Sequence, residues 1–245
     1  LGNTNAYRDA DDNLQFTDNT NTKVNLYKGT VTGSVYGGAL GQKGEGAANI
    51  PAYVFGDVTV ELNKGVPNDQ KGCVVEGNIF GCNNENGTPK RNVTVRIYKT
   101  QNKDAEHIAI LQSDNNPQAT NYPKRKGRYD VAAVYGGGNQ AAYYPVEGIS
   151  SEKNTKVEIY GCDETSIQYV YGGGNAAPVP GTEVIVNSSY EIYNLFGGGN
   201  GSGSATGADV GIFDHSAYSY ATEQSYGKGK AVTKLLGGDI NSVYG

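Results

Sequence analysis

The most constraining feature of the sequence is a short motif, Val-Tyr-Gly-Gly-Gly-Asn, that recurs along the chain. It stands at 134–139 and 170–175, and Leu-Phe-Gly-Gly-Gly-Asn occupies 195–200. Looser copies surround Tyr36 and Phe80. The intervals between copies are irregular, but two of them are close to twice about 22 to 25 residues, which is the length of one coil of a solenoid. The motif therefore predicts a coiled repeat fold.

Between the glycine motifs, apolar and polar residues alternate with a period of two. The alternation is clearest in TKVNLYKG, DVTVELNKG and NVTVRIYK, where Val and Ile hold many of the apolar positions. Such alternation predicts half-buried strands, with residues such as Val58, Val60 and Leu62 on one face. Only 104–111 has a helical pattern. The predicted strands lie within 22–29, 57–65, 92–99, 155–161, 182–189 and 230–238.

The glycine runs predict sharp corners between strands, because glycine adopts positive φ without steric cost. Asparagine tolerates the left-handed conformation, and stacked copies would form an amide ladder along the coil axis. The Val or Leu before the ring is expected to point inward, and the Tyr or Phe to point to the opposite face, where copies stack in a row. The predicted corner residues are Gly136, Gly137, Gly138, Asn139, Gly172, Gly173, Gly174, Asn175, Gly197, Gly198, Gly199 and Asn200.

These patterns together predict an all-β fold, a β-solenoid, and more narrowly a right-handed parallel β-helix with loop insertions. Seven or eight coils at about 4.8 Å each would make a rod about 35 Å long. Two other interpretations stay open at this point. The glycine runs are also typical of flexible linkers, and regular short strands are also typical of antiparallel hairpins in a sandwich or prism.

The repeat divides the chain into a main region and a leading segment. Residues 1–21 lie outside the repeat and are expected to form an irregular segment or cap. The solenoid is expected to span 22–245, with insertions at 101–130 and 201–227. We also expect the chain to be a segment of a longer protein.

The alternation of Val-x-Val-x-Ile strands with Val-Tyr-Gly-Gly-Gly-Asn motifs resembles repeat arrays in adhesin-like β-helix proteins on the surface of gut anaerobic bacteria. The resemblance covers most of 22–245, and the sequence departs from the repeat pattern in both insertions. It implies a cell-surface or extracellular location. It also implies that the insertions project as loops from the rod.

Composition and motifs exclude several other classes of function. The net charge of −5 gives no electrostatic attraction to nucleic acid, and no stretch approaches the roughly 18 apolar residues of a membrane span. Three cysteines without Cys-x-x-Cys spacing and two histidines predict no structural metal and no cofactor. Cys73 and Cys82 are close enough in sequence to pair, although buried reduced cysteines are the more frequent role.

Carbohydrate chemistry is the main alternative, since parallel β-helices host many polysaccharide lyases and glycoside hydrolases. Hydrolysis usually needs two carboxylates facing one cleft. Asp163 and Glu164, with Glu158 nearby, are the only acidic group close to a regular strand, and neighbours in sequence point to opposite faces of a strand. This pattern favours a protein that is not an enzyme.

The sequence thus predicts a noncatalytic structural or adhesive segment of a bacterial cell-surface or secreted protein, which binds glycans or proteins through its loops. Exposed tyrosines suit such contacts, because they combine a flat apolar face with a hydroxyl group. The predicted partners are glycans or host or bacterial surface proteins, and the alternative is a polysaccharide lyase or glycoside hydrolase on the same scaffold. The candidate ligand-binding residues are Tyr143, Tyr144, Tyr218, Tyr220 and Tyr226.

Overall fold

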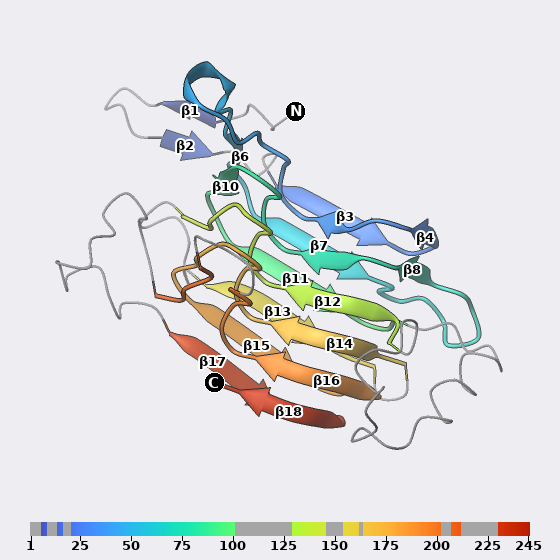
Figure 1. Cartoon of the computed structure of the whole chain (residues 1–245). Coiled ribbons are helices and arrows are strands. Elements are labelled where there is room, and N and C mark those ends of the chain that lie inside the picture. Colours follow the sequence, from blue (N-terminus) through green and yellow to red (C-terminus); the bar gives the residue numbers. More distant parts are fainter. Residues whose placement is uncertain are drawn as a thin grey trace.

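The computed structural model of the chain is a stack of coils, and each coil adds one strand to each of two large parallel sheets (Figure 1). It describes residues 6–8, 14–16, 21–100, 129–145, 154–161, 164–201, 207–211 and 230–245. In this part of the chain there is no α-helix, and the one helical turn is the 3-10 helix η2 at Gly46–Ala48. The predicted all-β solenoid is therefore confirmed.

The first sheet contains the six strands that the alternation predicted. They are β3 (Thr22–Leu26), β7 (Val58–Leu62), β11 (Val93–Ile97), β13 (Thr155–Ile159), β15 (Thr182–Val186) and β17 (Ala231–Leu235). Each pairs with the next in parallel and in full register, so that Val60 lies opposite Val24 and Val95. The register brings equivalent residues of successive coils into columns along the stack.

The second sheet contains the strands that end in the aromatic residue of the repeated motif. They are β5 (Val35–Tyr36), β9 (Asn78–Phe80), β12 (Val131–Tyr135), β14 (Ser166–Tyr171), β16 (Glu191–Phe196) and β18 (Ile240–Tyr244). These strands are also parallel to one another. Parallel pairing throughout both large sheets excludes the antiparallel hairpins and the flexible linkers considered above.

Short strands complete the periphery of the first coils. Parallel pairs join β4 (Gly29–Val31) to β8 (Cys73–Val75) and β6 (Ala52–Val54) to β10 (Gly87–Pro89). The antiparallel pair of β1 (Ala6–Arg8) and β2 (Leu14–Phe16) lies within the leading segment.

Each coil contributes one strand to each large sheet, so the described chain forms six coils. The expectation of seven or eight coils was too high because long connections take up part of the chain. One of these joins β11 to β12, and another joins β16 to β17. At about 4.8 Å per coil, the shortened stack spans about 25 Å between its outer strands.

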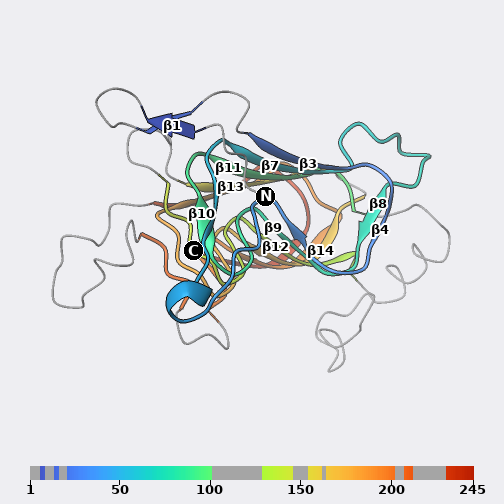
Figure 2. The same cartoon turned by 90° about the horizontal axis from the view of Figure 1, so that it is seen from above.

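The core lies between the two sheets, which face each other across it in Figure 2. Val60, Val95, Val157 and Val184 from the first sheet pack with Val134, Val170 and Leu195 from the second, and all are buried. Because side chains alternate along a strand, the residues between them face outward. The predicted common face of Val58, Val60 and Leu62 is confirmed, since all three side chains are buried.

The glycine corners turn the chain without positive φ. Glycines in the left-handed region include Gly29 and Gly87, but none of the nine glycines of the three full motifs is among them. The predicted reason for the glycines is therefore wrong. Close contact replaces it, because a β-carbon at Gly136 would lie 2.2 Å from the Gly172 carbonyl oxygen of the next coil.

The same close contact recurs at the first glycine of other motif copies. A β-carbon at Gly81 would lie 2.3 Å from the Gly136 oxygen, and one at Gly172 would lie 2.4 Å from the Gly197 oxygen. These glycines also face the first sheet, where Thr155 donates a 2.6 Å hydrogen bond from Oγ1 to the Gly172 oxygen. The two sheets and the successive coils thus meet at a point where no side chain fits.

Two of the three cysteines lie in the described part of the chain. Cys73 and Cys82 are both buried and unpaired, so they do not form the disulfide that their sequence spacing allowed. Burial raises the pKa of both thiols, most strongly for Cys82. They act as small core residues.

Candidate functional surfaces

The outer face of the second sheet carries a ladder of aromatic rings, one from each coil. Neighbouring rings are nearly parallel, with centroids 4.6 to 5.0 Å apart. Stacking buries the central rings, and burial raises the pKa of the Tyr135 and Tyr171 hydroxyls. The predicted aromatic row is confirmed. Its members are Tyr36, Phe80, Tyr135, Tyr171, Phe196 and Tyr244.

The asparagines that close the motif form the predicted amide ladder beside these rings. Asn200 donates from Nδ2 to Asn175 Oδ1 at 2.7 Å, and Asn175 donates in turn to Asn139 Oδ1 at 2.9 Å. Asn139 continues the chain of donors to Asn84 Oδ1 at 2.9 Å. The Tyr135 hydroxyl also donates to Asn175 Oδ1, at 3.3 Å. The side-chain amides are thus hydrogen-bonded to those of neighbouring coils.

The outer face of the first sheet carries an ion-pair ladder, which we define as Lys23, Glu61, Lys64, Arg96, Lys156, Glu158, Glu183 and Lys234. Charges alternate along it. Arg96 lies between Glu61 and Glu158, and Lys156 binds Glu183 at 3.2 Å. The ladder ends where Lys234 binds Glu183 at 2.6 Å. Sequence analysis missed this ladder, although seven of its eight members fall in two register columns of the predicted strands, with Lys64 just beyond β7.

The cations of the ladder lower the pKa values of Glu61 and Glu183. Burial alone would raise the pKa of Glu61, but the ammonium groups of Lys64 and Lys23 outweigh it and hold that pKa below its ordinary value. Hydrogen bonds from Lys234 and Lys156 likewise lower the pKa of Glu183 against the smaller effect of burial. A general acid for glycoside hydrolysis needs the opposite shift. Glu61 and Glu183 are therefore unsuited to that role.

The predicted ligand-binding tyrosines have separate outcomes. Tyr143 is fully buried, packs with Val54 and Val179, and donates from its hydroxyl to the Arg91 carbonyl oxygen at 2.7 Å. The expectation of an exposed ring at Tyr143 is wrong, because the chain after the corner folds back as a third side of the coil. Tyr144 is partly exposed. Tyr218, Tyr220 and Tyr226 lie outside the described residues.

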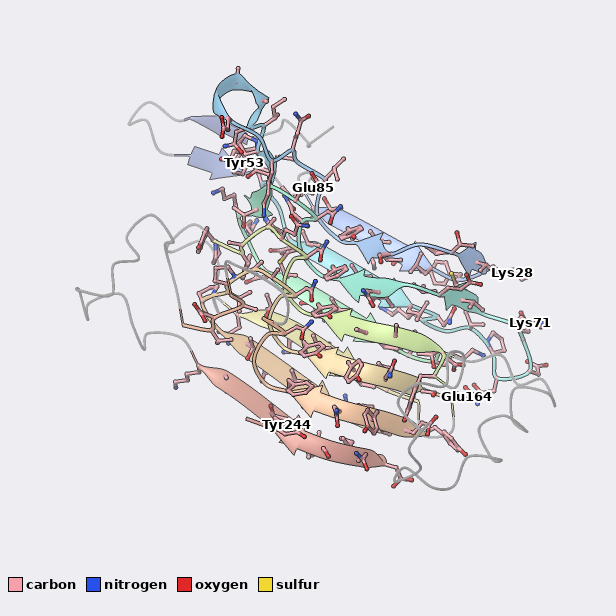
Figure 3. All side chains as sticks on the ribbon, viewed as in Figure 1. Lys28, Tyr53, Lys71, Glu85, Glu164 and Tyr244 are labelled. Carbon is pink, nitrogen blue, oxygen red and sulfur yellow. The ribbon has the colours of Figure 1, made fainter. Side chains whose placement is uncertain are left out.

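The acidic group near β13 does not form a paired site in the described structure. Glu158 is bound to Arg96, and Glu164 is largely buried, on the same side of the stack as Lys71 in Figure 3. Asp163 lies outside the described residues, as do the helical pattern at 104–111 and most of both predicted insertions.

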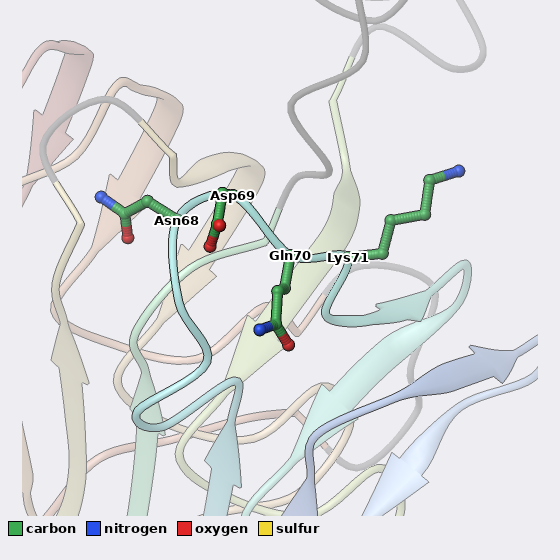
Figure 4. A pocket seen from close by; sticks show the side chains of 4 residues that line it. All are labelled: Asn68, Asp69, Gln70 and Lys71. Carbon is green, nitrogen blue, oxygen red and sulfur yellow. The ribbon is translucent and has the colours of Figure 1, made fainter.

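An open pocket lies in the connection between β7 and β8, lined by Asn68, Asp69, Gln70 and Lys71 (Figure 4). Beneath it, the buried ammonium of Lys99 donates to the carbonyl oxygens of Pro67 at 2.7 Å and Gln70 at 3.1 Å. This lysine holds the loop in place. The lining offers one carboxylate and one ammonium, which is too little for a paired-acid site.

Neither a metal-ligand cluster nor a membrane-spanning helix occurs in the described part of the chain. Within the ranges that the structure describes, no three His, Cys, Asp or Glu side chains come together as metal ligands. The described residues also include no helix with the length and apolar composition that a membrane crossing requires.

Comparison of the chain with protein-family models, curated proteins and solved structures finds no match.

Proposed function

We propose that this chain is a noncatalytic structural and adhesive segment of a bacterial cell-surface or secreted protein, a rigid solenoid that presents loops to glycans. The observation that carries the proposal is the pairing of outward side chains along the stack. Rings stack on rings, amides bond to amides, and carboxylates bind lysine or arginine of the next coil. A catalytic centre instead concentrates groups with shifted pKa values in one cleft.

The solenoid also suits the presentation of loops. The first predicted insertion, 101–130, lies between β11 and β12, and the second, 201–227, lies between β16 and β17. After each insertion the next strand rejoins its sheet in the common register, as β12 does beside β9 and β17 beside β15. Long insertions are tolerated in solenoids because each coil contacts only its neighbours.

Glycans are the ligand class that the tyrosines of the insertion favour. Tyr218, Tyr220 and Tyr226 lie close together in the sequence of the second insertion. Tyrosine rings offer a flat apolar face with a hydrogen-bonding hydroxyl, and lose little conformational entropy on binding. The cell-surface location follows the resemblance of the repeat to adhesin-like arrays.

A glycan array, followed by a polysaccharide-cleavage assay on each bound glycan, tests this function. We expect binding without new reducing ends or unsaturated products. Tyr218→Ala and Tyr220→Ala should weaken binding, and Tyr144→Ala tests the partly exposed ring beside the corner. Tyr27→Ala is the matched control, since Tyr27 is exposed on the solenoid body. Turnover abolished by Asp163→Ala would refute the proposal in favour of a carbohydrate-cleaving enzyme.

A further inference from the structure

The strands of the second sheet carry almost no charge. Glu191 is the one charged residue in its six strands, and these strands contain no Lys or Arg. Each of the six strands of the first sheet, in contrast, contains at least one charged residue. The two outer faces of the solenoid therefore differ in chemistry, and the strands of the second face offer no cation to an anionic ligand.

Beside the aromatic ladder, two strands of the second sheet present pairs of partly exposed residues. The core residues of β14 and β16 are three positions apart, so two neighbours in sequence lie between them. These pairs are Gln168 with Tyr169, and Tyr193 with Asn194. In the sheet, β14 lies between β12 and β16, and β16 lies between β14 and β18. The exposure of these pairs therefore does not depend on either end of the stack.

Three tyrosines form a second aromatic group, which we define as the tilted tyrosines: Tyr129, Tyr169 and Tyr193. The Tyr193 ring lies 6.1 Å from that of Tyr169 at an interplanar angle of 70°, and 6.2 Å from that of Tyr129 at 44°. The rings of the aromatic ladder are instead within 10° of parallel and cover one another's faces. Tilted rings leave part of their faces uncovered by one another. All three tyrosines are partly exposed, so this ring surface is open to a ligand.

An amide group lies next to the tilted tyrosines. Asn194 is the register partner of Tyr169, and its side chain forms no hydrogen bond within the described part of the chain. The asparagines of the amide ladder differ, since Asn175 and Asn139 are bonded to each other. A side-chain amide offers two hydrogen-bond donors and a carbonyl acceptor. The face thus combines open ring surface with a hydrogen-bonding group that the solenoid itself does not use.

These features fit an uncharged glycan better than a protein or an anion. A pyranose ring has C–H groups on its faces and hydroxyl groups around its rim, which match tyrosine rings beside an amide. A stable protein interface buries about 800 Å² and about 20 to 30 residues on each partner, far more than this small group provides. The absence of Lys and Arg from the strands of this sheet disfavours an acidic glycan.

We propose that the tilted tyrosines and Asn194 form a binding site for an uncharged glycan on the outer face of the second sheet. The site extends from the start of β12 across β14 to β16, which is about 10 Å along the stack and leaves room for a short oligosaccharide. This inference goes beyond the proposed function, which places glycan binding in the loops. The sheet site and the loop site can therefore fail separately.

Isothermal titration of the full chain with cellohexaose, xylohexaose and mannohexaose tests the site. We expect at least one of them to bind, with an affinity that is the same at low and high salt because no ion pair forms. Tyr193→Ala should weaken this binding by about twofold to tenfold through the lost ring contact, and Asn194→Ala by a similar factor through the lost hydrogen bonds. Tyr27→Ala, which removes an exposed ring outside the second sheet, is the matched control and should leave the affinity unchanged.

A second measurement uses the unchanged protein and does not depend on the folding of a variant. Acetylation by N-acetylimidazole, read from peptide masses, should slow at Tyr169 and Tyr193 when the hexasaccharide is bound, and should stay the same at Tyr27. The proposal is overturned if none of the three hexasaccharides binds, if neither tyrosine is protected, or if only the acidic hexagalacturonate binds. Binding that Tyr218→Ala abolishes and Tyr193→Ala leaves intact would also overturn the sheet site, while it would support glycan binding by the loops.

Discussion

Replacing Gly136 by alanine tests whether close contact between coils, rather than backbone conformation, requires the corner glycines. The added β-carbon would lie 2.2 Å from the Gly172 oxygen and 2.9 Å from Cβ of Thr155. Ordinary contacts between such atoms are longer by about 1 Å. Because both neighbours are held in place, by the next coil and by the first sheet, the coils must separate locally.

The cost of this separation has two parts. Forcing an extra carbon into a well-packed site costs about 1 to 3 kcal/mol. The 3.0 Å hydrogen bond from the Gly136 N–H to the Tyr171 oxygen lies at the same point, and weakening it adds up to about 1 kcal/mol. We expect a total loss of about 1 to 4 kcal/mol. For a chain of this length, that loss lowers the Tm by about 2 to 15 °C.

Two matched glycines separate the possible causes. A β-carbon at Gly33 would have no atom within 4 Å, and the φ of Gly33 is not positive, so Gly33→Ala should be neutral or slightly stabilising. Gly46 also has open space but a φ of 54°, so Gly46→Ala should cost about 1 kcal/mol through backbone strain alone. Urea denaturation of the three variants measures each change. A Gly136→Ala protein as stable as Gly33→Ala would refute the close-contact explanation.

Three further predictions concern the ladders and the cysteines. Asn175→Asp should destabilise the protein by about 1 to 3 kcal/mol at neutral pH, because a carboxylate cannot donate a hydrogen bond to Asn139. The loss of stability should shrink in acid, as the new carboxylate becomes protonated. Denaturation at two pH values checks both expectations. The pKa of Glu61 is lower in the folded protein than in the unfolded chain. Its contribution to stability is therefore present above the unfolded pKa and is lost as the pH falls through the folded pKa. In Glu61→Gln, the Tm should fall less steeply below about pH 4 than in the unchanged protein. Reductant should leave the Tm unchanged, and a clear drop in Tm on reduction would contradict that expectation. The thiols of Cys73 and Cys82 should react with a thiol reagent in the unfolded protein but only slowly in the folded one, because both are free and buried.

The strands could be predicted because apolar residues recur at every second position, which places them on one face of each strand. In β7, for example, Val58, Val60 and Leu62 all turn inward, as their spacing indicated. The aromatic and amide ladders could also be predicted, because a repeat in sequence becomes a column in space once the coils stack. The number of coils could not be predicted, because irregular intervals between motif copies do not distinguish a coil without the motif from a long connection.

The reason for the glycines could not be read from the full motifs, because positive φ and close contact both select glycine. A signal was present in the looser copies. Phe80 is followed by Gly81 and then by Cys82 and Asn83, so side chains fit at the second and third positions of that corner but not at the first. This is the position at which successive coils come closest. Tyr143 was misplaced for a different reason, since no sequence pattern marked the chain after the corner as a buried third side.

The parallel register of the two sheets has a mechanical consequence. Interstrand hydrogen bonds link each coil to the next, so they run along the stack and not across it. Tension between the first and last coils would pull on these bonds along their own direction and would peel one coil at a time, beginning at an end. Because each coil contacts only its neighbours, the others would keep their packing while one is released. A stalk built in this way would lengthen in steps under load, and would shorten again as each coil finds its register on the coil beneath it.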